Sequence, residues 1–394
     1  MKALIISIGT GARPGEEAIK SLGSGIAYSI HNSNPDKVFF VVSKESLNTT
    51  LPEILGSIDK PHEIISIDNP DDINKIYEDL SAKFRDIKKG FDHFTVDFTS
   101  GTKAMTGALT ILGNFYEADS LSYVTGKRSG GIVIKGTERL LSLRPYSIIV
   151  ERKLSEAVTF FNKCQLDSCL TLIEELLTRI PDPELLSQIT PFRNATLAYS
   201  VWDRFDHRVA FQNLKEVKFS HFDRNKGFLG KLLNEPEKDP YFVADLISNA
   251  KRRGDIEHKY DDGVARLYRT IELIAQYRLK KYGIDDTGNV PKEKIPSQFI
   301  SELKLVDGKA KIGLYQAYQF LAALDDNLGQ SLLQDKKLKD LLQRRNVSIL
   351  AHGLKPVAKE DYEQLRDSVV SYAERALHNI GDLMSQSTFV SWPE

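Results

Sequence analysis

Arginine and histidine, two residue types suited to phosphate chemistry, lie close together near the end of the sequence. In the stretch LLQRRNVSILAHGLKP, residues 341–356, Arg345 and His352 are seven positions apart, and Asn346 directly follows the arginine. Histidine transfers protons near neutral pH, and a guanidinium group stabilises charge on a phosphorane-like transition state. The pair could therefore cleave an RNA phosphodiester without a metal ion, with the ribose 2′-hydroxyl as the nucleophile and a 2′,3′-cyclic phosphate as the product.

The spacing of this pair is a weak signal on its own. In a regular helix seven residues make nearly two turns, so Arg345 and His352 would share a face, roughly 10 Å apart along the axis. A comparable spacing arises by chance, and a second one separates Arg253 from His258. In the stretch KRRGDIEHKYDD around that second pair, Gly254 and the dense charges predict a solvent-exposed helix start. The alternative for Arg345 and His352 is also structural, with the histidine capping a helix and the arginine on its surface.

A second group of functional residue types follows two predicted strands in the first third of the chain. SIGTG contains Gly9, Thr10 and Gly11. DFTSGTKAM contains a run of polar and small residues, namely Asp97, Thr99, Ser100, Gly101, Thr102 and Lys103. Ligands of open parallel sheets bind beyond the carboxyl ends of the strands, so both segments should line one crevice. Glycines allow a close backbone approach, hydroxyls and helix N–H groups donate hydrogen bonds, and the lysine adds positive charge, which favours a phosphate or ribose ligand.

The familiar nucleotide motifs do not match these two segments. Pro14 occupies the position at which a dinucleotide fingerprint requires glycine, and SGTKAM lacks the upstream glycine and the Gly–Lys pair of a P-loop. NAD or ATP bound in the usual manner is therefore not expected. The structural alternative is that TSGT only turns a strand into a helix, with Ser100 or Thr102 as the N-cap, and that Asp97 is a buried polar residue bonded to backbone groups.

The elements that must position these residues divide the chain into three parts. Residues 1–150 alternate short runs rich in Val, Ile and Phe with segments of helical period, which predicts an α/β Rossmann-like domain with a parallel sheet. The predicted strands are KALIISIG, KVFFVVS, HEIISI, FTVDFTS, LSYVTG and GIVIKG, and the last two should pair as a hairpin. Residues 151–240 predict an all-α connector and residues 241–394 an all-α bundle, since apolar residues recur there at helical spacing.

Composition excludes several classes of protein. The 394 residues include 53 basic and 54 acidic ones, and a net charge of −1 argues against coating duplex nucleic acid by bulk electrostatics. No run approaches the about 18 apolar residues of a membrane span, and the first residues predict a strand rather than a signal peptide. The only cysteines, Cys164 and Cys169, lack the spacing of a zinc site or a disulfide scaffold. We therefore expect no metal or cofactor, no membrane partner and a reducing cytoplasm.

The first part resembles a known sensor domain. A first strand ending in a small polar glycine turn, together with DFTSGTKAM after the fourth strand, is similar to CARF domains, the CRISPR-associated Rossmann-like sensors. This resemblance spans residues 1–150 and implies a homodimer whose two equivalent loops form one pocket for a cyclic oligoadenylate, either the tetra-adenylate or the hexa-adenylate. It also implies that the phosphates and riboses of this ligand contact Thr10, Gly11, Thr99, Ser100, Gly101, Thr102 and Lys103.

The carboxyl-terminal part resembles the HEPN ribonucleases, in which a polar residue follows the arginine and the histidine lies near a glycine. Arg345, Asn346 and His352 match that signature, and the resemblance makes them the catalytic residues. A CARF sensor and a HEPN motif in one chain resemble the ancillary ribonucleases of type III CRISPR antiviral defence. The combined resemblance implies a cytoplasmic bacterial or archaeal homodimer, in which the cyclic oligoadenylate is the allosteric activator of single-stranded RNA cleavage.

Two other functions fit the same residues. The chain could be a ligand-responsive, non-catalytic regulator whose helical part binds RNA or a protein without cutting, or its sensor domain could also degrade the cyclic oligoadenylate. Arg266 and Arg269 on the long helical segment could contact RNA. The simpler expectation is that one of these arginines pairs with Glu272, while the apolar residues of the same helix face the core.

Overall fold

The computed structural model describes residues 1–11, 15–129, 132–143, 146–179, 183–345, 348–351 and 353–393. The chain divides into two compact units, Met1–Lys153 and Leu154–Glu394. Among the described residues, no helix combines the length and the apolar character that crossing a membrane would need.

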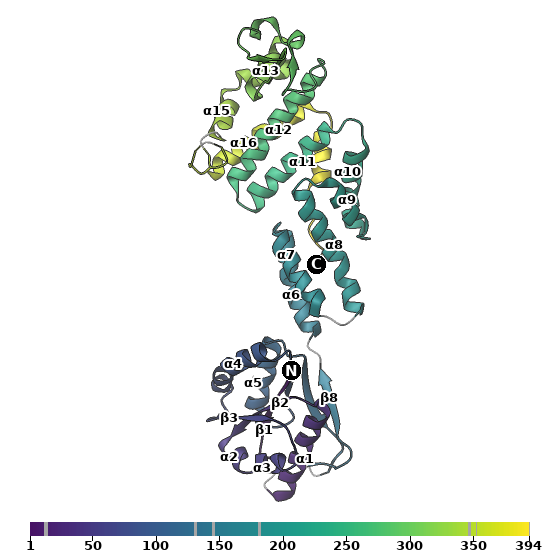
Figure 1. Ribbon diagram of the computed structural model, residues 1–394, viewed down its shortest axis with the longest axis vertical. Helices are drawn as coiled ribbons and strands as arrows, with labels where there is room; N and C mark the ends of the chain where they lie inside the picture. Colours follow the sequence, from purple (N-terminus) through teal and green to yellow (C-terminus); the bar gives the residue numbers. More distant parts are fainter. Residues whose placement is uncertain are drawn as a thin grey trace. The chain divides into compact units, whose positions relative to one another are not determined.

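The first unit is built around a six-stranded sheet in the order β3-β2-β1-β4-β5-β8 (Figure 1). Its strands are β1 (Lys2–Ile8), β2 (Lys37–Ser43), β3 (His62–Ile67), β4 (His93–Asp97), β5 (Ser120–Thr125) and β8 (Arg139–Leu143). The first five strands are parallel, and β8 pairs antiparallel with β5. The predicted α/β fold with a Rossmann-like parallel sheet is confirmed.

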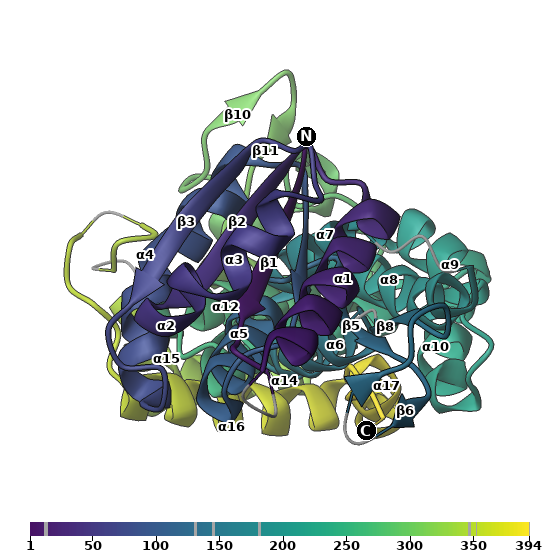
Figure 2. The ribbon, with the colours of Figure 1, turned by 90° about the horizontal axis from the view of Figure 1, so that it is seen from below.

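Helices cover both faces of this sheet. They are α1 (Glu16–Ser33), α2 (Lys44–Asn48), α3 (Thr50–Leu55), α4 (Ile73–Gly90) and α5 (Lys103–Phe115). Successive side chains of a strand point to opposite faces, so Leu4 and Ile6 of β1 pack with α1 and α3, while Ala3 and Ile5 pack with α4 and α5. Figure 2 shows β1, β2 and β3 side by side in this sheet. The strand order reverses between β1 and β4, which makes their carboxyl ends the switch point of the sheet.

The predicted hairpin between LSYVTG and GIVIKG is wrong. LSYVTG contributes to β5, which pairs with β8, whereas GIVIKG supplies β7 (Ile132–Val133). β7 pairs instead with β6 (Arg128–Ser129) in a separate two-stranded ribbon. β8 lies at the edge of the sheet and is mostly exposed, so its sequence RLLSL lacks the apolar pattern by which the buried strands were predicted.

The second unit is predominantly helical. Its α-helices, the first of which begins in the first unit, are α6 (Tyr146–Asn162), α7 (Leu166–Arg179), α8 (Pro183–Asp203), α9 (His207–Lys215), α10 (Asp223–Asn234), α11 (Asp239–Lys251), α12 (Tyr260–Lys280), α13 (Leu314–Ala323), α14 (Asn327–Gln334), α15 (Lys336–Arg344), α16 (Lys359–Ala376) and α17 (Ile380–Ser387). The shorter helices are η1 (Ser220–Phe222), η2 (Arg252–Ile256), η3 (Lys292–Lys294) and η4 (Ser297–Phe299). A small sheet that the sequence did not predict is formed by β9 (Val290–Pro291), β10 (Leu305–Val306) and β11 (Lys309–Ala310).

The long helix α12 is the centre of this unit and packs against α11, α13 and α16. Leu267, Ile271 and Ile274 are fully buried along one stripe of α12. On its outer surface Arg269 pairs with Glu272 at 3.4 Å, which confirms the expected ion pair. An amphipathic helix of this kind gains most of its stability from the buried stripe rather than from its exposed ion pairs.

The last residues of the chain pack into the helical connector. The ring of Phe389 stacks on Tyr199 of α8, with 4.0 Å between ring centroids, and Trp392 lies 4.5 Å from Phe192 by the same measure. The backbone N–H of Val390 also donates to the Tyr199 hydroxyl at 3.1 Å. The carboxyl-terminal segment is therefore half-buried against the aromatic residues of the connector helices.

Candidate functional site

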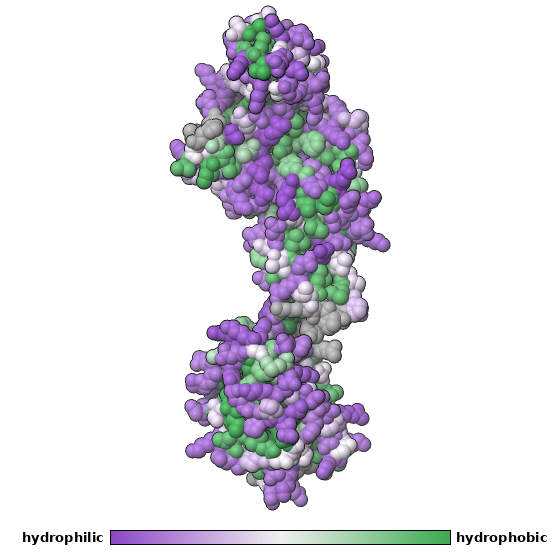
Figure 3. Space-filling view, viewed as in Figure 1, coloured by the Kyte–Doolittle hydropathy of each residue, from purple (hydrophilic) through white to green (hydrophobic). Residues whose placement is uncertain are grey.

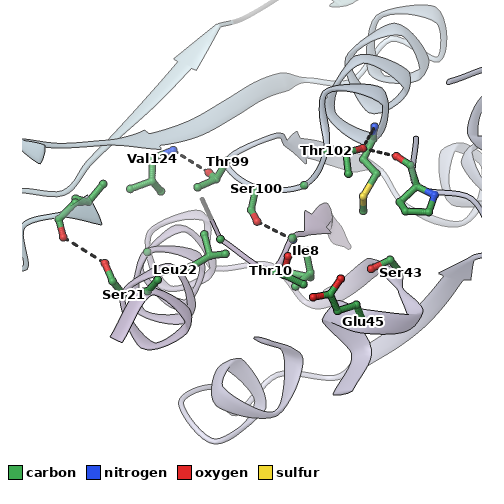
Figure 4. Close-up of a pocket in the computed structure, with 18 of the residues that line it drawn as sticks. Ile8, Thr10, Ser21, Leu22, Ser43, Glu45, Thr99, Ser100, Thr102 and Val124 are labelled. Atoms are coloured by element: carbon green, nitrogen blue, oxygen red, sulfur yellow. Dashed lines mark hydrogen bonds between the residues drawn. The ribbon is translucent and has the colours of Figure 1, made fainter. Parts of the chain in front are cut away.

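Both predicted loops of the first unit line one cavity of about 500 Å³ at the carboxyl ends of β1 and β4 (Figure 4). Six of the seven predicted ligand contacts are among its lining residues, namely Thr10, Gly11, Thr99, Ser100, Gly101 and Thr102. The seventh, Lys103, is the exposed first residue of α5 and does not line the cavity. The switch point of the sheet thus brings the two segments together.

Two glycines let these loops touch. The backbone N–H of Gly9 donates to Ser100 Oγ at 2.8 Å, and the Ser7 hydroxyl donates to the Ser100 carbonyl oxygen. A Cβ atom on Gly9 would lie 2.8 Å from the backbone nitrogen of Gly101, whose own φ of +117° disfavours any side chain. A side chain at either glycine would therefore force the loops apart.

Three hydroxyls of the DFTSGTKAM loop already bond within the protein. Each accepts a backbone N–H: Thr99 Oγ1 from Val124 at 2.8 Å, Ser100 Oγ from Gly9, and Thr102 Oγ1 from Met105 at 3.1 Å. Thr102 is the N-cap of α5 and also donates to the Pro70 carbonyl oxygen. A hydroxyl has one donor proton, so Ser100 retains a proton for a ligand, whereas Thr99 would have to give up Asp97 and Thr102 would have to give up Pro70.

Asp97 holds this loop in place through hydrogen bonds on the side away from the cavity. Its carboxylate is fully buried and accepts hydrogen bonds from the Ser29 hydroxyl at 2.5 Å, the Ser122 hydroxyl at 3.1 Å and the Thr99 backbone N–H at 2.8 Å. Burial raises the pKa of Asp97, and these hydrogen bonds oppose the rise. Asp97 thus links α1, β4 and β5 beneath the cavity. The hydrogen bond from the Thr99 backbone is the kind that the sequence predicts for a buried aspartate, and the two bonds from serine hydroxyls are additional.

The sequence missed several cavity-lining residues. One wall of the cavity is formed by one face of α1. The residues on this face are small or apolar and recur at helical spacing, namely Ala18, Ser21, Leu22 and Gly25. Ser21 donates to the Val133 carbonyl oxygen at 3.3 Å and so joins α1 to the β6–β7 ribbon. Three carboxylates, from Glu45, Asp71 and Glu138, also line the cavity. In the described part of the chain, no three His, Cys, Asp or Glu side chains are grouped as a metal site would require.

The predicted catalytic motif does not lie on one regular helix. Helix α15 ends at Arg344 with Arg345 as its C-cap, and residues 348–351 form turns. In these turns the Ser348 carbonyl oxygen accepts hydrogen bonds from the N–H groups of Ala351 and Gly353. The expectation of one regular helix running from Arg345 to His352 is therefore wrong, because residues 348–351 between them are not helical. Asn346 and His352 lie outside the described residues.

Arg345 is half-buried and lies over the ring of Tyr268 on α12, with 4.8 Å from its Cζ atom to the ring centroid. Its Nε atom is buried and has no hydrogen-bond partner among the described residues. Burial raises the pKa of the Tyr268 hydroxyl, as does Glu272, while the charge of Arg345 opposes the rise. A guanidinium group in this setting can still donate hydrogen bonds to a phosphate.

The second arginine and histidine pair is not the solvent-exposed helix start that the sequence predicts. Arg252 is 3% exposed, pairs with Asp203 at 2.9 Å and lies over the Phe389 ring at 3.8 Å. Arg253 bonds Asp203 and also Glu257, at 2.7 Å. His258 alone of that pair is exposed. The prediction failed because Asp203, distant in the sequence, neutralises charges that local composition assigns to solvent.

The connector segment WDRFDHR supplies much of this buried network. The indole N–H of Trp202 donates to Asp245 Oδ1 at 3.0 Å, and His207 Nε2 lies 2.7 Å from Asp245 Oδ2. Asp203, between them in sequence, binds both Arg252 and Arg253. These contacts attach the connector helices to α11 and η2.

Comparisons with known proteins match the second unit to two family models. The Csm6 HEPN domain matches residues 232–376, and the Csm6 6H domain matches residues 150–239. No curated protein matches the sequence. Among solved structures, the chain is similar to Enterococcus italicus Csm6 bound to cyclic hexa-2′-fluoro-hexa-dAMP, with 14% sequence identity, a TM-score of 0.66 and coverage of 98% of each chain.

Together, the two family models and the structural match cover both units of the chain. The HEPN range contains Arg345, Asn346 and His352, and the 6H range contains the helices that follow the sheet. The structural likeness extends the shared fold over the first unit. The chain therefore belongs to the Csm6 family of CRISPR-associated proteins, which combine a CARF domain with a HEPN ribonuclease domain.

Proposed function

We propose that this protein is a metal-independent endoribonuclease of type III CRISPR antiviral defence, which cuts single-stranded RNA when a cyclic oligoadenylate binds its CARF domain. The observation that carries the proposal is the match of the Csm6 HEPN domain to residues 232–376, because that range includes Arg345, Asn346 and His352. The fold shared with a Csm6 that was solved with a cyclic hexanucleotide supports the choice of activator.

The cavity of the first unit is the proposed activator site. Backbone N–H groups at the glycine turns and the free hydroxyl proton of Ser100 suit the phosphates and riboses of a cyclic oligoadenylate. One chain supplies one set of loops, whereas a cyclic oligoadenylate repeats the same groups around a ring. Two copies of the chain related by a two-fold axis would present matching loops to one ring, which favours a homodimer.

The proposed RNA chemistry uses the carboxyl-terminal motif. His352 moves the protons, Arg345 stabilises the charge that develops on the phosphate, and Asn346 donates a hydrogen bond to it. The ribose 2′-hydroxyl is the nucleophile and the 5′-oxygen is the leaving group, so the products carry a 2′,3′-cyclic phosphate and a 5′-hydroxyl. DNA lacks this nucleophile and should resist cleavage.

Apolar residues around the motif support pairing of two HEPN domains. Ile349 and Leu350 in the turn after Arg345 are exposed, and Leu354 is 88% exposed. Figure 3 shows hydrophobic residues gathered beside the end of α15. Exposed apolar groups of this kind often mark an interface, and a second copy here would complete the site with its own motif. The activator would control cleavage by binding the active arrangement of this dimer more tightly than the resting one.

The first experiment measures cleavage of labelled single-stranded RNA in EDTA, with and without cyclic tetra-adenylate or hexa-adenylate. We expect one ring to activate the wild type and His352→Ala and Arg345→Ala to abolish cleavage. His258→Asn is the matched control and should cut normally, because its arginine partners are buried in ion pairs. Ring binding without RNA cleavage by the wild type would contradict the ribonuclease and leave a non-catalytic regulator.

The cavity also favours testing a second function, degradation of the activator by the CARF domain. Glu45, Asp71 and Glu138 bring carboxylates to the cavity, and a carboxylate can act as a general base. Loss of cyclic oligoadenylate over time in His352→Ala protein would reveal this activity, because the HEPN site is disabled in that variant. A stable ring would exclude it.

A further inference from the structure

Tyr268 is the side chain of α12 that contacts the proposed catalytic arginine. It is half-buried beside the fully buried stripe of Leu267 and Ile271, so its ring has a defined position at the edge of the core. Arg345 lies over this ring from the end of α15, with its Cζ atom 4.8 Å from the ring centroid. This is within the distance at which a guanidinium group is attracted to an aromatic face.

The charge of Arg345 is not neutralised by an acidic side chain of the described part of the protein. The Nε atom is buried without a hydrogen-bond partner, and no described carboxylate forms an ion pair with this guanidinium group. Glu272, one turn along α12 from Tyr268, is instead paired with Arg269 at 3.4 Å. Arg269 is further held by Gln276 Oε1 at 3.1 Å, which keeps the pair on the outer surface of α12.

An aromatic ring suits an arginine that must later bind phosphate. A carboxylate partner would bind the guanidinium N–H groups and compete with the RNA for them, whereas a ring face attracts the cation and leaves the edge N–H groups free. Orientation is needed at this position because α15 ends at Arg344 and turns follow, so the backbone around Arg345 is not held in a continuing helix.

We infer that Tyr268 is a positioning residue for RNA cleavage, whose ring holds the Arg345 guanidinium group in the orientation that meets the scissile phosphate. The inference deepens the proposed function and rests on it. Tyr268 acts through Arg345 and not through its own hydroxyl, so phenylalanine should replace it and aliphatic residues should not.

The test measures kcat and KM for activated RNA cleavage in Tyr268→Phe, Tyr268→Leu and Tyr268→Met, beside the wild type and Arg345→Ala. We expect Tyr268→Leu and Tyr268→Met to lower kcat about tenfold, equivalent to ~1.4 kcal/mol of transition-state stabilisation, with KM changed less than about threefold. Tyr268→Phe should stay within about twofold of the wild type, because the ring face remains. Two aliphatic variants are used so that a folding defect in one, seen as a lowered thermal midpoint, does not decide the result.

Tyr277→Leu is the matched control on the same helix. Its ring carries a comparable cation, with Lys281 Nζ 4.9 Å from the ring centroid, but it does not contact the catalytic motif among the described residues. The control should leave kcat unchanged. In an Arg345→Lys background, Tyr268→Leu should lower kcat far less than in the wild type, because the planar group that the ring orients is already gone.

Three results would overturn the inference. An equal loss in Tyr268→Phe and Tyr268→Leu would assign the effect to the hydroxyl, and a change confined to KM would make Tyr268 an RNA contact. Cleavage that requires Arg345 but is unaffected by either aliphatic variant would reject the positioning role while leaving the proposed ribonuclease intact. Absence of any RNA cleavage by the wild type would instead reject the ribonuclease and this inference together.

Discussion

Gly254 illustrates how a single residue decides packing in the HEPN unit. A Cβ atom there would lie 2.0 Å from the Cζ atom of Tyr362, because the tyrosine ring rests directly on the glycine. The Tyr362 hydroxyl completes the contact by donating to Asp255 Oδ1 at 2.9 Å. The sequence predicts exposure for Gly254 from its charged neighbours, but the space it leaves is filled by a ring from α16.

Gly254→Ala should therefore destabilise the second unit by about 2–3 kcal/mol, the usual effect of overpacking a dense core. Both tryptophans of the chain, Trp202 and Trp392, belong to this unit, so tryptophan fluorescence during urea unfolding reports on it. Gly227→Ala, at an exposed position of α10 where an added Cβ meets nothing within 4 Å, is the control and should be neutral or slightly stabilising. Equal unfolding midpoints for the two variants would contradict the contact.

At the scale of elements, the end of α8 is joined to η2 by buried charges. Asp203 binds Arg252 Nε at 2.9 Å, accepts from Asn249 Nδ2 at the same distance, and pairs with Arg253. Removing one partner of a buried ion pair leaves the other charge without compensation, which costs more than the pair itself contributes. The link between connector and HEPN helices depends on this carboxylate.

Asp203→Ala should lower the free energy of unfolding of the second unit by about 3–5 kcal/mol, since two arginines lose their buried acceptor. The exposed pair between Glu174 and Arg193, at 2.6 Å, provides the comparison. Glu174→Ala should cost no more than about 1 kcal/mol, because water screens that pair. Tryptophan fluorescence in urea measures both variants, and a small loss for Asp203→Ala would show that the buried arginines find other acceptors.

At the scale of the whole molecule, the proposed ribonuclease requires two chains. The apolar turn after Arg345 contains the exposed Ile349 and Leu350, and Leu354 follows it. A charge placed on this surface would have to be desolvated if a second copy covered it, and would cost little if the surface faced water. Activity and self-association should therefore fail together.

Leu354→Glu should shift the protein toward monomer in sedimentation velocity and reduce activated RNA cleavage by about tenfold or more, equivalent to ~1.4 kcal/mol. Its unfolding midpoint should be unchanged, because Leu354 packs against little of its own chain. Val306→Glu on β10, where the valine is 60% exposed, is the control and should affect neither quantity. A Leu354→Glu protein that sediments and cuts like the wild type would rule out an interface at this turn.

The sequence by itself determined most of the elements and much of the proposed activator site. Strands buried on both faces are continuous apolar runs, which made β1, β2 and β4 recognisable, and helical periodicity predicted the predominantly helical second unit but not its small sheet of β9, β10 and β11. The edge strand β3 was also predicted as a buried run, although its residues alternate between exposed and half-buried until the last. Because parallel strands end at one edge, the sequence also placed Thr10 and Gly11 beside Thr99 and Ser100. The assignment of Arg345, Asn346 and His352 as catalytic residues came from resemblance and stays a prediction.

Only the tertiary structure decided which distant residues meet. It ended α15 before Arg345 and placed Tyr268 under the guanidinium group, and it buried Arg252 against Asp203. It also paired β5 with the exposed strand β8. The physical reason is common to all of these: periodicity records which face of an element is apolar, whereas partners for an arginine, a glycine or a strand edge depend on how elements far apart in sequence pack together.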